Sequence, residues 1–150
     1  MADIKKIIFV EDHGNERAIM AKIMFDGGNT SEVVSDARGL TVLFPEPINQ
    51  KVEAVLISNG YTIPEFSSSE LKETDFADTT LILTMEEQQK ERILDRFPDA
   101  KNVQVLTDLT GDELDIMDPI GSPLTSYGLC FESLSIIIKK LLLLLGKGER

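Results

Sequence analysis

The sequence predicts an α/β domain, a three-layer sandwich with a central four-stranded parallel sheet and helices on both faces. Short apolar or β-branched runs with the length of buried strands recur at 7–10, 32–35, 79–84 and 103–106. Helix-forming segments separate these runs, and alternation of strand and helix is typical of parallel sheets. A chain of 150 residues has the length of one domain, so we expect a single domain over 1–150.

The first half of the chain contains two strands and two helices. The strand 7–10 leads through a polar loop into a helix that begins near Arg17 and ends at Gly27-Gly28-Asn29. The second strand follows at 32–35. Pro45, Pro47 and Asn49 then mark the start of a second helix, which stops at Asn59-Gly60.

The second half begins with a serine-rich segment, 67–69, which offers caps for a short helix ending at Lys72 or Glu73. After the strand 79–84, a charged helix over 86–97 is stopped by Pro98, and the fourth strand is 103–106. Residues 108–123 have the composition of a loop. A long helix over 125–145 ends the domain. Its apolar part contains Lys139 and Lys140 and is too short to span a bilayer, so we expect a buried helix.

Net charge restricts the classes of partner. The formal charge is -11 and the pI is about 4.5, which argues against nucleic acid and against an anionic membrane surface, since both need clustered Lys and Arg. The single cysteine, Cys130, cannot form an internal disulfide, and the first residues lack the apolar core of a signal peptide. We therefore expect a cytoplasmic protein.

The loop 11–17 is the first candidate site. A strand, a short loop and a helix N-terminus form the usual phosphate cradle of α/β proteins, and Arg17 would add two further donors. The same loop carries Glu11, Asp12 and Glu16, whose charges oppose anion binding. Because the carboxyl ends of parallel strands meet at one edge, the loop 108–123 should lie nearby and bring Asp118 close to Arg17.

The order of these features resembles the low-molecular-weight protein tyrosine phosphatase family, including its bacterial arginine-phosphatase branch. The resemblance covers nearly the whole chain. It is carried by Val10 followed after six residues by Arg17, by Met20-Ala21, by 79–85 with Gln89-Lys90 and Phe97-Pro98, and by 115–121 with Tyr127 downstream.

The resemblance implies which residues occupy the family's catalytic positions. Glu11 stands at the position of the nucleophilic cysteine, Arg17 at the phosphate-binding arginine and Asp118 at the general acid. Ala18 follows the arginine, where a serine is usual. Cys130 lies in the last helix and cannot substitute for the nucleophile. The corresponding phosphate loop is Glu11, Asp12, His13, Gly14, Asn15, Glu16 and Arg17.

These departures predict a catalytically inactive protein that acts as a binding or regulatory module. We expect Arg17 to pair with Glu11 or Glu16 in place of a substrate. Glu11 has two interpretations, a built-in phosphate mimic or drift after activity was lost. Asp118 is either an inherited general acid or an ordinary turn residue.

Three alternatives remain open. The first is an altered phosphatase. The second is a metal-dependent enzyme that uses Glu11, Asp12, Glu16 and Asp118 as oxygen ligands. The third is a receiver-like signalling domain, because acidic residues follow the first strand; that reading needs a strand-end aspartate, which 55–58 lacks.

The remaining expectations concern side chains and partners. His13 should be solvated, and Tyr127 should pack or cap the Asp118 loop rather than catalyse. We expect no cofactor and no resident metal, an unknown protein partner, a bacterial source, and a monomer or weak homodimer.

Overall fold

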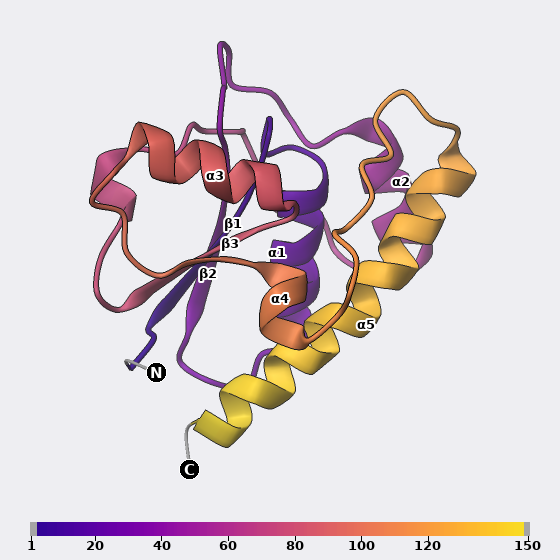
Figure 1. Ribbon diagram of the computed structural model, residues 1–150. Helices are drawn as coiled ribbons and strands as arrows, with labels where there is room; N and C mark the ends of the chain where they lie inside the picture. The colour runs from indigo at the N-terminus through magenta and orange to yellow at the C-terminus, as the bar shows by residue number, and fades with distance from the viewer. Residues whose placement is uncertain (1–2, 149–150) are drawn as a thin grey trace.

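The computed structural model describes residues 3–148, and it contains a parallel four-stranded sheet in the order β2-β1-β3-β4 (Figure 1). The predicted α/β fold with a central parallel sheet is therefore confirmed. The elements are β1 (Lys6–Glu11), α1 (Arg17–Gly28), β2 (Val34–Gly39), α2 (Gln50–Ser58), a 3-10 turn η1 (Glu73–Asp75), β3 (Thr80–Thr84), α3 (Glu87–Arg96), β4 (Val103–Val105), α4 (Leu106–Thr110) and α5 (Leu124–Gly148).

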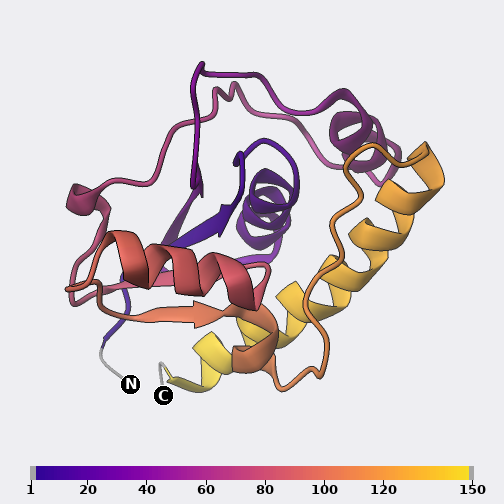
Figure 2. The ribbon, with the colours of Figure 1, turned by 45° about the horizontal axis from the view of Figure 1, so that its top comes forward.

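The central strands are buried on both faces, and their side chains alternate between two cores. Ile7 and Phe9 belong to the larger core, together with residues of α1, α2 and α5. Ile8 and Val10 point the other way and share a smaller core with Ile93 of α3. Figures 1 and 2 show α3 on one side of the sheet and α1 and α5 on the other. Because successive side chains of each central strand point to opposite faces of the sheet, helices pack on both faces and the domain has three layers.

The predicted second helix is confirmed together with its cap. Asn49 accepts hydrogen bonds from the amides of Lys51 and Val52 at 2.8 and 3.3 Å, so donors of the first turn are satisfied. The helix α2 ends at Ser58, as Asn59-Gly60 predicts. Its buried residues Val52, Val55 and Leu56 form one face that packs into the larger core.

The second strand was placed too early by the sequence. It runs over Val34–Gly39, paired in parallel with β1 from Lys6↔Val34 to Glu11↔Gly39. The strand lies at the edge of the sheet, and its sequence includes Asp36 and Arg38, which form an ion pair at 2.9 Å. An edge strand with polar side chains lacks the apolar run that identifies a central strand.

The predicted short helix from the serines 67–69 to Lys72 or Glu73 is wrong. The segment is extended, because its backbone bonds to the end of β2. The Gly39 amide donates to Ser69 at 2.9 Å and the Leu71 amide to Gly39 at 2.8 Å. Only the 3-10 turn η1 follows, so tertiary hydrogen bonds override the local capping signal.

The predicted fourth strand and the loop after it also differ from the structure. The strand β4 ends at Val105, and α4 occupies Leu106–Thr110 until Gly111, whose φ of +80° ends the helix. The last helix, α5, extends beyond 125–145 at both ends and buries Leu134 and Leu141. Within 3–148, no helix has both the length and the apolar character needed to cross a membrane.

Candidate functional site

The candidate site lies at the carboxyl edge of the sheet, where the loop after β1 turns into α1. Its backbone is held by the segment that follows β2. The amides of Leu40 and Thr41 donate to the carbonyls of Glu11 and Asp12 at 2.9 and 3.0 Å. Main-chain hydrogen bonds therefore hold the first residues of the loop against the segment after β2.

Two glycines allow this close packing. Gly14 has a φ of +83°, and a Cβ there would lie 2.7 Å from the Gly39 nitrogen. A Cβ on Gly39 would lie 2.5 Å from the carbonyl carbon of His13. Any larger side chain would push the loop away from β2, so both positions need glycine.

The carboxylate of Glu11 occupies the inside of the loop. Its Oε2 accepts hydrogen bonds from the amides of Glu16 at 3.0 Å and Ala18 at 2.7 Å. Glu16, the N-cap residue of α1, provides no side-chain cap of its own. Glu11 is only 4% exposed, so an internal carboxylate satisfies the positive end of this helix.

Arg17 contacts three carboxylates and one carbonyl. Its Nε lies 3.3 Å from Oε1 of Glu11, and its Nη2 lies 2.7 Å from Glu86 and 3.6 Å from Asp118. Its Nη1 donates to the Ile116 carbonyl at 2.9 Å. The predicted contacts of Arg17 with Glu11 and Asp118 are confirmed. The Arg17 side chain is 1% exposed, and each of its three guanidinium nitrogens has a partner.

Burial and charge act on this pair in opposite directions. Burial raises the pKa of Glu11, and the charge of Arg17 and the hydrogen bond from the Ala18 amide counteract that rise. For Arg17, burial alone would lower the pKa, but Glu11, Glu86 and Asp118 together raise it above its ordinary value. Arg17 is therefore a permanent cation whose charge is compensated within the protein.

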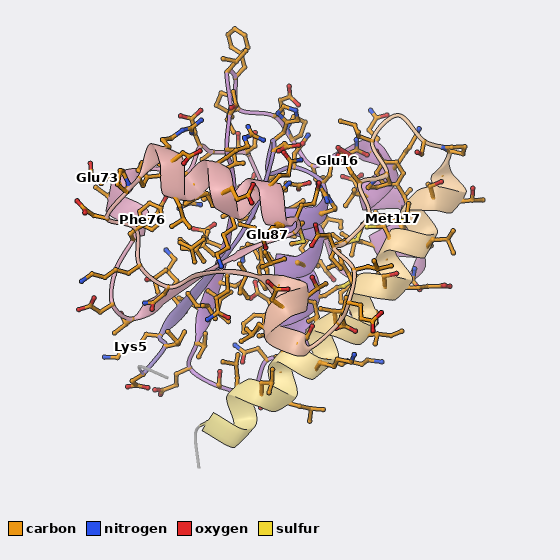
Figure 3. The ribbon with its side chains drawn as sticks, in the orientation of Figure 1. Lys5, Glu16, Glu73, Phe76, Glu87 and Met117 are labelled. Carbon is orange, nitrogen blue, oxygen red and sulfur yellow. The ribbon has the colours of Figure 1, made fainter. Side chains whose placement is uncertain are left out.

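Of the two carboxylates expected to pair with Arg17, Glu11 is the one that does so, and within 3–148 Glu16 forms no ion pair with Arg17. Its Oε1 accepts a hydrogen bond of 2.5 Å from the hydroxyl of Tyr127 in α5. Both side chains are buried, and burial together with Glu16 raises the pKa of Tyr127. Figure 3 labels Glu16 at the start of α1 and Met117 in the loop before α5. Tyr127 packs as expected and also fixes Glu16.

The other polar side chains of the loop turn outward. Asp12 pairs with Arg92 of α3 at 2.7 Å, and the exposed His13 lies with its Nδ1 3.3 Å from the Thr41 carbonyl. Asn15 donates to Glu46 and to the Pro47 carbonyl, both at 3.3 Å. Across 3–148, no three side chains of the types His, Cys, Asp and Glu are grouped as a metal site.

Asp118 and Cys130 complete the surroundings of Arg17. Asp118 accepts a hydrogen bond from the Ile120 amide at 3.0 Å, an Asx turn that keeps its carboxylate beside Arg17. Cys130 is buried in α5 with its Sγ 3.8 Å from the Met117 carbonyl. Burial raises the pKa of this cysteine to about 12, so its side chain is a thiol rather than a thiolate.

Sequence reasoning missed Glu86 and the carbonyl of Ile116 as partners of Arg17. Glu86 lies between the end of β3 and the start of α3, at the carboxyl edge of the sheet. This position could have predicted that Glu86 lies close to Arg17. Glu87 beside it donates its amide to Asp115 at 3.1 Å, and the Ile116 amide donates to Met85 at 3.1 Å. These bonds join the loop after α4 to the start of α3.

Comparisons with known proteins identify the family. The model of the family described as "Low molecular weight phosphotyrosine protein phosphatase" matches residues 6–149. The chain belongs to this family. The resemblance inferred from the order of its motifs is therefore confirmed, and it extends over nearly the whole chain.

Several members of the family are similar to this chain over most of its length. A low molecular weight protein-tyrosine-phosphatase of Staphylococcus haemolyticus is 26% identical over 110 residues, which are 71% of this chain and 75% of that protein. A protein-arginine-phosphatase of Geobacillus stearothermophilus is 26% identical over 138 residues, 91% and 93% of the two chains.

Solved structures of the family have the same fold. An arginine phosphatase structure from Geobacillus stearothermophilus superposes with a TM-score of 0.89 at 26% identity and covers 97% of this chain and 95% of its own. A low molecular weight protein tyrosine phosphatase from T. tengcongensis gives a TM-score of 0.84, also at 26% identity, and the match covers 91% of this chain and 97% of that chain. The layers and the loop described above are thus those of the phosphatase fold.

Proposed function

We propose that this family member is catalytically inactive and acts as a binding or regulatory module. The observation that carries the proposal is the Glu11 carboxylate inside the loop, bonded to the amides of Glu16 and Ala18 and to Arg17. These donors are the groups that would hold a phosphate in an anion-binding loop. In this chain the internal carboxylate of Glu11 accepts the hydrogen bonds of these donors.

The chemistry of the family needs a thiolate that attacks phosphorus, and the resemblance places Glu11 at that position. A carboxylate there is a poor substitute, because it repels an incoming phosphate by about 4 kcal/mol per pair of unit charges near contact at an effective dielectric of 20. Asp118, the family's general acid position, then has no nucleophile to serve. Its present role is to pair with Arg17.

Buried Cys130 does not replace the nucleophile in this proposal. Burial holds it as a thiol, and its sulfur contacts the Met117 carbonyl. Relatives in Staphylococcus and Geobacillus favour a bacterial source, and we propose a cytoplasmic protein that is a monomer or weak homodimer.

An assay of phosphate release tests the proposal. Its substrates are an aryl phosphate, a phosphotyrosine peptide and phosphoarginine, because the relatives include a protein-tyrosine-phosphatase and a protein-arginine-phosphatase. We expect no turnover by the wild type or by Cys130→Ala. The double variant Glu11→Cys, Ala18→Ser restores a thiol and its supporting hydroxyl. We expect it to gain a covalent phosphoenzyme or measurable turnover, because Arg17 and Asp118 are already in place.

One result would overturn the proposal. Turnover by the wild type that copurifies with the protein through several columns, and that Glu11→Gln abolishes, would mean that the acidic loop is a working active site.

A further inference from the structure

A cavity of about 340 Å³ opens beside the loop 11–17. Residues of this loop form one wall, the segment after β2 forms a second, and Ile120 of the loop before α5 completes it. Figure 2 shows the segment after β2 and the loop before α5 beside the loop that follows β1. The cavity is distinct from the interior of the loop, which the Glu11 side chain fills.

The charged groups in this cavity are carboxylates. Glu16 and Glu46 line it, and among the described residues no lysine or arginine does. Glu16 is 5% exposed and uses Oε1 for Tyr127, whereas its Oε2 has no hydrogen-bond partner within 3–148. No fully buried side-chain oxygen lacks a partner in this part of the chain, so Oε2 keeps some exposed surface, and Glu16 is one of the residues that line the cavity. An accessible acceptor without a hydrogen-bond partner, on a residue that lines a cavity, favours a ligand that donates.

Large apolar side chains surround the same opening. Leu43 is 83% exposed, Phe44 78% and Ile120 55%, and all three line the cavity. Apolar side chains of this size gathered around one opening are typical of interaction sites. A ligand that fits has a cationic end for the carboxylates and apolar surface for these residues.

We propose that this cavity binds the side chain of an arginine or lysine from a basic segment of a partner protein. The proposal names the ligand class of the binding module proposed above and rests on that function. Arginine and lysine side chains both join an aliphatic stem to a cationic end. The stem fits the apolar side chains around the opening, and the cationic end fits the carboxylates that line the cavity. A guanidinium can also stack on Phe44. The net charge of -11 attracts such a segment from solution.

The probe for the test is a fluorescein-labelled peptide, Gly-Leu-Arg-Leu-Gly, titrated in low salt and followed by fluorescence anisotropy. The matched peptide carries citrulline, which keeps the shape of arginine and lacks its charge. We expect the arginine peptide to bind at least about tenfold more tightly than the citrulline peptide, the difference expected for a charge-assisted hydrogen bond. A lysine peptide should bind with similar affinity, and added salt should weaken both.

Matched variants assign the binding to this cavity. Glu46→Gln and Glu16→Gln each remove one charge and keep an acceptor, and we expect each to weaken the arginine peptide by about five- to tenfold. Phe44→Ala should weaken it as well. Glu32→Gln is the control, because Glu32 is exposed just before β2, at the opposite end of the strands. It should bind like the wild type, and thermal melts confirm that each variant is folded.

Three results would overturn the inference: no saturable binding of the arginine peptide, equal binding of the citrulline peptide, or unchanged affinity in folded Glu46→Gln and Glu16→Gln. A failure here is distinguishable from failure of the proposed inactivity. Phosphate release by the wild type would overturn that inactivity and leave the peptide titration unaffected.

Discussion

The side chains of Glu11 and Arg17, six residues apart, contact each other inside the first loop, with 3.3 Å between Oε1 and Nε. Both are buried, at 4% and 1% exposure. Removal of one member of a buried pair leaves the other charge without compensation, so the loop depends on both.

Arg17→Ala should destabilise the protein by about 3 kcal/mol or more at neutral pH, because Glu11 loses its cation and the Ile116 carbonyl loses its donor. Chemical denaturation of wild type and variant at pH 7 measures this loss. Arg92→Ala removes a partly exposed pair with Asp12 and should cost less than about 1 kcal/mol.

The same loss should shrink in acid. Burial raises the pKa of Glu11 in the folded protein, and the charge of Arg17 limits that rise. Without Arg17 the folded-state pKa of Glu11 rises further, so ionised Glu11 opposes folding as the pH increases above its ordinary value of 4.5. Near pH 4.5 and below, Glu11 takes up a proton and this penalty disappears. An Arg17→Ala deficit that is independent of pH from 4.5 to 7 would argue against the pair.

Tyr127→Phe should cost about 1–3 kcal/mol of folding stability, because it removes the hydroxyl that donates to buried Glu16. Tyr61→Phe is the control, since no hydrogen bond within 3–148 uses the Tyr61 hydroxyl, and it should stay within about 0.5 kcal/mol of the wild type. Thermal melts compare the two. Equal effects in both variants would mean that the bond between Tyr127 and Glu16 contributes nothing.

Gly39→Ala should destabilise by about 1–3 kcal/mol, because the new Cβ would lie 2.5 Å from the backbone of His13. Gly128→Ala, in α5, meets nothing within 4 Å and should stabilise by about 0.5–1 kcal/mol through helix propensity. Denaturation midpoints should therefore move in opposite directions. A Gly39→Ala variant as stable as the wild type would show that the loop can move away from β2 at little cost.

The parts of the fold that the sequence predicts correctly are those where one local signal dominates. Apolar runs mark β1 and β3, and Asn49 marks the start of α2. The polar edge strand β2 and the extended segment near Glu70 depend on partners distant in sequence. Short helices such as α4 form only in the context of the packed domain.

The site shows the same division. The contact between Glu11 and Arg17 spans six residues and could be predicted from the loop alone. Glu86, between β3 and α3, and Ile116, in the loop between α4 and α5, are distant from Arg17 in the sequence but contact it in the fold. Glu16 accepts a hydrogen bond from Tyr127, which lies 111 residues away in the sequence. Local spacing determines which groups meet within a loop, and tertiary packing determines what closes over it.

Anion binding tests the central claim that Glu11 occupies the loop in place of a phosphate. Isothermal titration with orthovanadate at pH 7 compares the wild type with Glu11→Ala, which frees the amides of Glu16 and Ala18 and the guanidinium of Arg17. The account predicts no saturable binding to the wild type and binding of one equivalent to folded Glu11→Ala. Tight, stoichiometric binding of vanadate to the wild type would contradict it.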